Sequence, residues 1–214
     1  MAELPATPAT PTIQAGPAVV DDRPRCWWSA PGATPGRADP LMVRYHDEEW
    51  GSPVHDDVEL YERLALESFQ AGLSWATILR KREAFRAAFR GFEPRIVAAF
   101  DDHDRARLLA DAGIVRNRAK IEATIGNASA TLEIAQELGS FDAYLRDLIP
   151  PPPRRQPPGA TRADVPARTP LSDAVSADLR GRGFRFVGST IVYAFMQSVG
   201  LVDDHLPGCF RYRG

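Results

Sequence analysis

Two cysteines and two histidines near opposite ends of the chain could together hold a metal ion. Cys26 and Cys209 are the only cysteines among 214 residues, and His46 and His205 lie 20 and four residues from them. Two thiolates and two imidazoles make a complete tetrahedral shell for zinc. The gap between Cys26 and His46 fits no standard zinc finger, and a buried pair of free thiols or a disulfide would use the same cysteines. Spacing alone leaves these readings open.

The N-terminal sequence disfavours the disulfide. Residues 1–24 are rich in Ala, Pro and Thr and lack the apolar stretch that directs secretion. We therefore expect a cytoplasmic protein, in which disulfides are rare.

A carboxylate within the apolar stripe of a predicted helix is the second candidate. Glu67 lies seven residues after Leu60, three after Leu64 and four before Ala71. These spacings place side chains on one helix face. A carboxylate there is costly unless it is paired or used. Pairing with Arg63 at the rim of the helix and a functional role both remain open.

Aromatic residues crowd the same part of the sequence. All four tryptophans lie within the first 75 residues. Core packing would explain one or two of them. A flat slot of aromatic faces with one buried carboxylate would instead suit a planar, cationic heterocycle, and the carboxylate would accept N–H bonds from a purine edge. The aromatic set is Trp27, Trp28, Tyr45, Trp50 and Trp75.

A helix, a glycine-containing hairpin and a second helix are predicted around Gly113. The hairpin amides and the N-terminus of the second helix would form an anion site. Arg116, Arg118 and Lys120 add the local positive charge that a phosphate backbone needs. An αα-hairpin with solvated basic residues would give the same pattern.

The composition limits the class of protein. The length and the 44% hydrophobic content predict one globular domain. A net charge of −2 means that any nucleic acid must bind a local basic patch. No run of residues is long and apolar enough to span a membrane.

Capping residues and hydrophobic periodicity predict an all-α fold with two helical lobes and no strand. Asp56 and Ser74 fit helix N-caps, and Gly72 and Gly91 fit helix stops. Residues 1–24 are expected to be a disordered extension and residues 25–214 one domain, with a proline-rich surface segment at 150–170. A loop is expected at 29–40. The expected helices cover about residues 56–71, 74–90, 94–100, 102–112, 117–138, 141–148, 172–180 and 189–199.

Together these segments resemble the DNA-3-methyladenine glycosylase I family, bacterial base-excision enzymes of the helix-hairpin-helix glycosylase superfamily. The resemblance covers about residues 25 to 212, with the segments in family order. The matching segments are Arg25–Trp28, Tyr45–Gly51, Leu66–Trp75, Asp111–Arg116, Arg182–Gly188 and Asp204–Cys209.

The resemblance implies a helix-hairpin-helix glycosylase fold in which a structural zinc ion joins the N- and C-terminal regions. It also implies that Glu67 is the catalytic residue that contacts the excised base. The implied zinc ligands are Cys26, His46, His205 and Cys209. The implied walls of the base slot are Trp28, Tyr45, Trp50 and Trp75. The implied DNA contacts are Gly72, Leu73, Gly113, Arg116, Arg118 and Lys120.

The chain departs from the family pattern at three places. Met42 stands where the family often has a second tyrosine, so one wall of the slot differs. Val115 replaces the second hairpin glycine, and the loop between Cys26 and His46 is long. We therefore expect contacts with DNA that are similar to those of the family but not identical to them.

The implied reaction is hydrolysis of the N-glycosidic bond of 3-methyladenine, flipped out of alkylated double-stranded DNA. The family is similar in lacking a catalytic aspartate, and residues Ile134–Gln136 offer none here. No lyase step is expected, because Asn117 stands where bifunctional relatives have a lysine. We expect a monomer acting on the nucleoid. The alternatives are a non-catalytic damage-binding protein of the same fold and a zinc-stapled helical interaction module.

Overall fold

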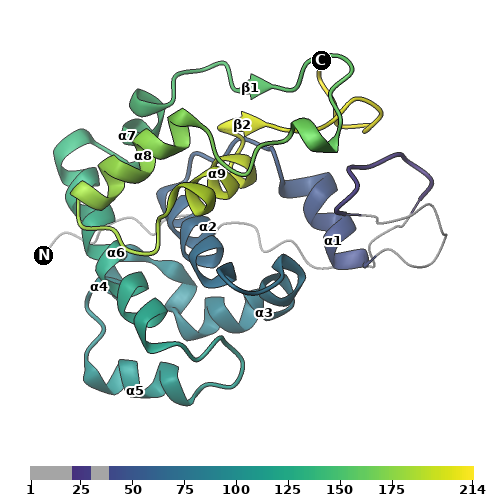
Figure 1. Ribbon diagram of the computed structural model, residues 1–214. Coiled ribbons are helices and arrows are strands. Elements are labelled where there is room, and N and C mark those ends of the chain that lie inside the picture. Colours follow the sequence, from purple (N-terminus) through teal and green to yellow (C-terminus); the bar gives the residue numbers. More distant parts are fainter. Residues whose placement is uncertain (1–20, 30–38) are drawn as a thin grey trace, which may run out of the picture.

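Helices form most of the structure, a computed structural model that describes residues 21–29 and 39–214 (Figure 1). Most of the predicted disordered extension and of the predicted loop, residues 1–20 and 30–38, lies outside the described residues. The helices are α1 (Pro40–Arg44), η1 (Tyr45–Glu49), α2 (Asp57–Gln70), α3 (Trp75–Ala88), η2 (Arg90–Phe92), α4 (Pro94–Ala98), α5 (Asp102–Ala110), α6 (Arg118–Leu138), α7 (Phe141–Leu148), η3 (Arg162–Asp164), α8 (Pro170–Gly181) and α9 (Ser189–Ser198). The strands are β1 (Arg154–Arg155) and β2 (Val202–Asp203).

Side-chain caps begin the helices near the positions predicted from the sequence. Asp56 accepts a hydrogen bond from the Glu59 amide, and Ser74 accepts one from the Thr77 amide. Asn117 begins α6 in the same way. Each cap satisfies a backbone N–H that has no partner within its own helix.

Two predicted caps lie one or three residues from the real ones. Asp101, rather than Asp102, caps α5. Thr169, rather than Ser172, caps α8, because Pro170 occupies the first helical position. Ser172 is the third residue of that helix, and its hydroxyl accepts a hydrogen bond from the Thr169 amide.

The prediction of no strand was wrong, because the described residues include two strands of two residues each. β1 and β2 pair in parallel, with Arg154 opposite Val202 and Arg155 opposite Asp203. Two-residue strands are too short to show an alternating pattern in the sequence. The segment Pro40–Glu49 is also helical, with Asp39 as the cap of α1, although no helix was predicted there.

Two hydrophobic clusters flank α2 and correspond to the two predicted lobes. One face of α2, with Leu60 and Leu64, packs in a cluster with residues of α6 to α9. Another face, with Tyr61 and Phe69, packs in a cluster with residues of α3 to α6. Both faces of α2 are therefore buried, so a polar side chain on this helix is fixed in an apolar surrounding.

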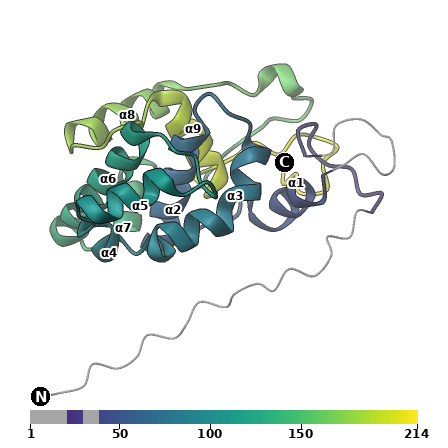
Figure 2. The same cartoon turned by 90° about the horizontal axis from the view of Figure 1, so that it is seen from below.

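The described N-terminal segment and the C-terminal loop lie side by side in both views (Figures 1 and 2). The Phe210 amide donates to the Pro24 carbonyl, and the Gly51 amide donates to the Gln197 carbonyl. A third hydrophobic cluster at this junction contains both cysteines together with Tyr45. Across the described part of the chain, no helix combines the length and the apolar character that a bilayer crossing requires.

Candidate functional site

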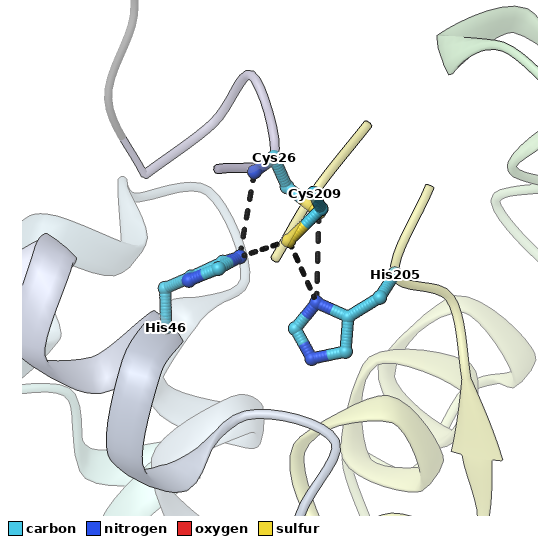
Figure 3. Close-up of side chains that lie close together, drawn as sticks. All are labelled: Cys26, His46, His205 and Cys209. Carbon is cyan, nitrogen blue, oxygen red and sulfur yellow. Dashed lines mark hydrogen bonds between the residues drawn. The ribbon is translucent and has the colours of Figure 1, made fainter. Parts of the chain in front are cut away.

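The two cysteines and two histidines meet in one buried cluster (Figure 3). Their ligand atoms lie within 4.8 Å of one another. Cys26 Sγ is 3.7 Å and Cys209 Sγ is 3.6 Å from His205 Nδ1. Cys209 Sγ is 3.4 Å from His46 Nε2. Both cysteines are free thiols, so the disulfide reading is wrong.

These separations fit a tetrahedral metal ion. Zinc bonds sulfur at about 2.3 Å and nitrogen at about 2.0–2.1 Å, which at tetrahedral angles separates the sulfur and nitrogen by about 3.6 Å. The donor set of two sulfurs and two imidazole nitrogens is also the one that zinc favours. The cluster could therefore bind a metal ion.

The outer nitrogens of both histidines are held by hydrogen bonds. His46 Nδ1 lies 2.8 Å from Asp47 Oδ1, and Arg25 in turn donates to Asp47. His205 Nε2 lies 3.3 Å from the Trp50 carbonyl oxygen. Such partners fix the ring orientation and direct the inner nitrogens into the cluster, where His46 Nε2 also accepts a hydrogen bond from the Cys26 amide at 3.4 Å.

A cavity of about 310 Å³ opens beside this cluster. Its walls come from the N-terminal segment 21–29, the helices α1 and η1, α2, the N-terminus of α3, the proline-rich segment and α9. The lining residues are Trp27, Trp28, Met42, Tyr45, Trp50, Glu67, Gln70, Trp75, Val165, Pro166, Ala194 and Gln197.

All four predicted slot aromatics line this cavity. The rings of Trp28 and Trp50 have centroids 5.0 Å apart and cross at 71°. The rings of Tyr45 and Trp75 are 5.1 Å apart and cross at 52°. Because these rings pack edge to face or tilted, each supports its neighbour while part of its surface remains open to the cavity.

Glu67 is the buried acid of the cavity. It is 4% exposed, and its Oε2 atom has no hydrogen-bond partner among the described residues. The indole Nε1 of Trp75 also has no hydrogen-bond partner among the described residues. Burial raises the pKa of Glu67 to about 8, although the charge of Arg63 acts in the opposite direction. An unpaired donor and an unpaired acceptor in one cavity are suited to a polar planar ligand.

The alternative role predicted for Glu67 was wrong. Arg63 forms ion pairs with Glu49 at 2.6 Å and Glu59 at 2.7 Å. No ion pair between Arg63 and Glu67 is found among the described residues. The arginine therefore acts on Glu67 through its charge and not as a partner at the helix rim.

Several lining residues were not predicted. Gln70 lies three residues after Glu67 and thus on the same helix face, and Gln197 is a polar residue within an apolar helix; both were detectable in the sequence. Val165 and Pro166 come from the segment predicted to be a surface excursion. That interpretation needs correction, because part of the segment forms a cavity wall and Gln156 in it is 2% exposed.

The hairpin between α5 and α6 is fixed by short-range contacts. The Gly113 amide donates to Asp111 Oδ1 at 2.7 Å. A Cβ on Gly113 would lie 2.9 Å from that oxygen and 3.0 Å from the Ala84 Cβ, so a larger residue would require these neighbours to shift. Lys81 Nζ donates to the carbonyls of Ala112 and Gly113 at 3.0 Å.

The predicted basic residues of the hairpin separate into two groups. Arg116 and Arg118 are exposed. Lys120 is 6% exposed, and its Nζ donates to the carbonyl oxygens of Phe69 at 2.8 Å and Ala71 at 2.7 Å. Its predicted role as a phosphate contact is therefore corrected: Lys120 binds the C-terminal carbonyls of α2, which lack partners within that helix.

The loop after α2 is exposed at its tip. Gly72 has φ of 81°, a conformation that glycine adopts without strain. The Leu73 side chain that follows is 43% exposed. The predicted loop residues directly follow Gln70, which lines the cavity.

Comparison with known proteins assigns the family. The sequence model of the family described as methyladenine glycosylase matches residues 36–212.

The chain belongs to the methyladenine glycosylase family.

Curated members of the family are similar over nearly their whole length. The chain is 46% identical to DNA-3-methyladenine glycosylase 1 of Escherichia coli (strain K12) over 190 residues, which are 89% of this chain and 97% of that protein. It is 42% identical to DNA-3-methyladenine glycosylase of Haemophilus influenzae over 169 residues, 79% of this chain and 91% of that protein.

Solved structures of family members have the same fold. A crystal structure of 3-methyladenine DNA glycosylase I matches with a TM-score of 0.81 and 45% identity, covering 88% of this chain and 99% of that one. The enzyme from Staphylococcus aureus, in a structure described as the basis of its 3-methyladenine recognition, matches with a TM-score of 0.77 and 39% identity, covering 80% and 91%.

Proposed function

We propose that this protein is a DNA glycosylase that hydrolyses the N-glycosidic bond of 3-methyladenine in alkylated double-stranded DNA. The observation that carries the proposal is the buried Glu67 carboxyl, with an unpaired oxygen inside an aromatic cavity. The family relatives named as 3-methyladenine glycosylases support the same substrate.

The chemistry of the substrate matches that of the cavity. Methylation at N3 makes the adenine of a nucleotide cationic, and aromatic faces attract a planar cation. A carboxylate accepts hydrogen bonds from the exocyclic amine of adenine. A positive base beside Glu67 also favours the ionised carboxylate, because an opposite charge lowers its pKa. The cavity is thus selective for the alkylated base over neutral adenine.

The reaction needs little further assistance from the protein. The nucleotide must leave the base stack before it reaches the cavity. The cationic base is a good leaving group, so water can attack C1′ as the glycosidic bond breaks. Binding and orientation of the base by Glu67 and the aromatic walls then supply most of the selectivity.

A lyase step would require a free amine near the sugar. The chain has two lysines, Lys81 and Lys120. Both ammonium groups donate to backbone carbonyls. Asn117, at the position where bifunctional relatives are expected to have a lysine, caps α6. These contacts support a monofunctional enzyme.

We further infer that zinc occupies the cluster of Cys26, His46, His205 and Cys209. Bound there, zinc would supply a cross-link and no catalysis, because four protein ligands leave no position for water. Asp47 and the Trp50 carbonyl would hold the two imidazoles in place for it. The cross-link would stabilise the segment that carries Trp28, Tyr45 and Trp50.

We also propose that one domain, residues 25–214, acts as a monomer on the DNA of the nucleoid, in the cytoplasm. Gly113, Arg116 and Arg118 would hold the phosphate backbone. Gly72 and Leu73 would fill the space left by the extruded base. The exposure of Arg116, Arg118 and Leu73 supports these contacts.

The test is base release from methylated duplex DNA, with the free base separated by chromatography. The wild type should release 3-methyladenine, and Glu67→Gln should release it much more slowly. Glu133→Gln, at an exposed position on α6, should behave as the wild type. A protein that binds methylated DNA but releases no base would be the non-catalytic alternative. A borohydride-stable protein–DNA adduct would contradict the monofunctional reaction.

A further inference from the structure

Phe186 is an exposed phenylalanine in a backbone conformation that favours glycine. Its φ is 55°, and 40% of the residue is exposed. Another phenylalanine with positive φ, Phe92, is fully buried in a hydrophobic cluster, so packing explains its conformation. Burial gives no such explanation for Phe186. A strained residue persists only where the surrounding structure holds it, and such positions are often functional.

Buried side chains hold the backbone of this residue from two helices. Ser68 on α2 donates its hydroxyl to the Phe186 carbonyl at 3.0 Å. Asn127 on α6 donates to the Arg185 carbonyl at 3.0 Å and accepts from the Arg185 amide at 2.8 Å. Ser68 is 3% exposed and Asn127 is 2% exposed. The ring of Phe186 is thus presented to solvent from a rigid base.

This rigid base is shared with the cavity and with the loop that follows α2. Ser68 is the neighbour of Glu67 in the sequence. Two residues of α6 anchor the segments that precede Leu73 and Phe186, two exposed apolar side chains. Lys120 donates to the Ala71 carbonyl, and Asn127 donates to the Arg185 carbonyl. Seven residues of an α-helix are two turns and span about 10 Å. The two anchoring residues, Lys120 and Asn127, are therefore separated along the axis of α6 by about three base steps of 3.4 Å.

We propose that Phe186 is a second DNA wedge, which stacks on or between bases of the duplex that flanks the extruded nucleotide. Apolar side chains such as Phe and Leu are used in this way by proteins that kink or open DNA. Arg185, which is exposed and has no ion pair among the described residues, would bind a phosphate beside the wedge. The inference rests on the proposed function, because it assumes an alkylated duplex at this face.

The test uses Phe186→Gly and Phe186→Ala beside the wild type. Glycine tolerates a positive φ, so Phe186→Gly should not lower the thermal midpoint. We expect base release from duplex DNA, at enzyme concentrations below saturation, to fall about 10-fold. Affinity for free 3-methyladenine, followed by tryptophan fluorescence, should stay unchanged because the cavity is intact. Ile96→Ala, 48% exposed on α4, is the matched control and should leave both quantities unchanged.

Each outcome decides between the two proposals. Equal base release from duplex by Phe186→Gly and the wild type would overturn the wedge and leave the glycosylase assignment intact. If the wild type releases no base, the proposed function fails instead. The wedge is then tested by the affinity for a duplex containing a stable abasic analogue, measured by fluorescence anisotropy. An affinity of Phe186→Gly equal to that of the wild type would overturn it, and an affinity about 10-fold weaker would support it.

Discussion

Replacing Glu67 by glutamine should stabilise the protein while it impairs base release. The pKa of Glu67 is raised from 4.5 to about 8 by burial. The folded protein therefore binds this proton more tightly than the unfolded chain does. The contribution of Glu67 to the free energy of unfolding is most favourable below pH 4.5 and is lost as the pH rises toward 8. Glutamine carries no titratable group and should abolish this pH dependence.

The size of the effect follows from the two pKa values. Each pH unit between them changes the free energy of unfolding by about 1.4 kcal/mol. At pH 7 the wild type should therefore be less stable than at low pH by about 3 kcal/mol on account of this one group. Near pH 5 the difference should be below about 1 kcal/mol. A change of about 3 kcal/mol corresponds to a shift of roughly 6–12 °C in the midpoint of a chain this long.

The assay is urea or thermal unfolding of the wild type and Glu67→Gln, measured side by side from pH 5 to pH 8. The difference between the two proteins is the informative quantity, because other groups and any bound metal titrate equally in both. Glu133→Gln is the control for replacing a carboxylate at an exposed position. Base release from methylated duplex DNA is measured on the same preparations.

A difference in stability that stays constant from pH 5 to pH 8 would refute the reasoning. It would mean that the carboxyl of Glu67 is solvated or paired in solution, and that its pKa is ordinary. Unchanged base release by Glu67→Gln would refute the proposed contact between Glu67 and the base.

Four further predictions concern the cavity, the hairpin and the metal cluster. Arg63→Met should raise the pKa of Glu67 further, because the charge of the arginine lowers that pKa. The acid limb of the pH–rate profile for base release should therefore move to higher pH, and an unshifted profile would contradict this role of Arg63. Lys120→Met should cost about 1–3 kcal/mol in the free energy of unfolding, since two carbonyls lose their donor, but should leave the salt dependence of DNA affinity unchanged. Arg116→Ala should instead reduce the slope of log affinity against log salt by about 1 with little loss of stability. Metal analysis of the purified protein should give one zinc per chain. Chelation should lower the thermal midpoint and weaken binding of free 3-methyladenine, because Cys26 and Cys209 would no longer fix the cavity wall. An unaltered midpoint in metal-free protein would contradict the structural role of the metal.

Local signals in the sequence were enough to predict the positions of most helices and the residues that could do chemistry. Asp56 and Ser74 mark helix starts because a cap acts on amides two or three residues away. The spacing of Glu67 from Leu60 and Leu64 placed it on a buried face because helix periodicity is also local. The four metal-ligand candidates stood out by their side-chain chemistry and their order along the chain.

The contacts of those residues became visible only in the folded chain. Lys120 looks like a phosphate ligand in the sequence, but the end of α2 packs beside it and offers two carbonyl oxygens. Val165 belongs to a proline-rich segment, and yet it lines the cavity. Phe186 has no local signal at all, since its conformation is imposed by Ser68 and Asn127 from helices distant in sequence. Caps and periodicity act over a few residues and can be seen in the sequence, whereas burial, pairing and exposure depend on which distant segments the folded chain brings together.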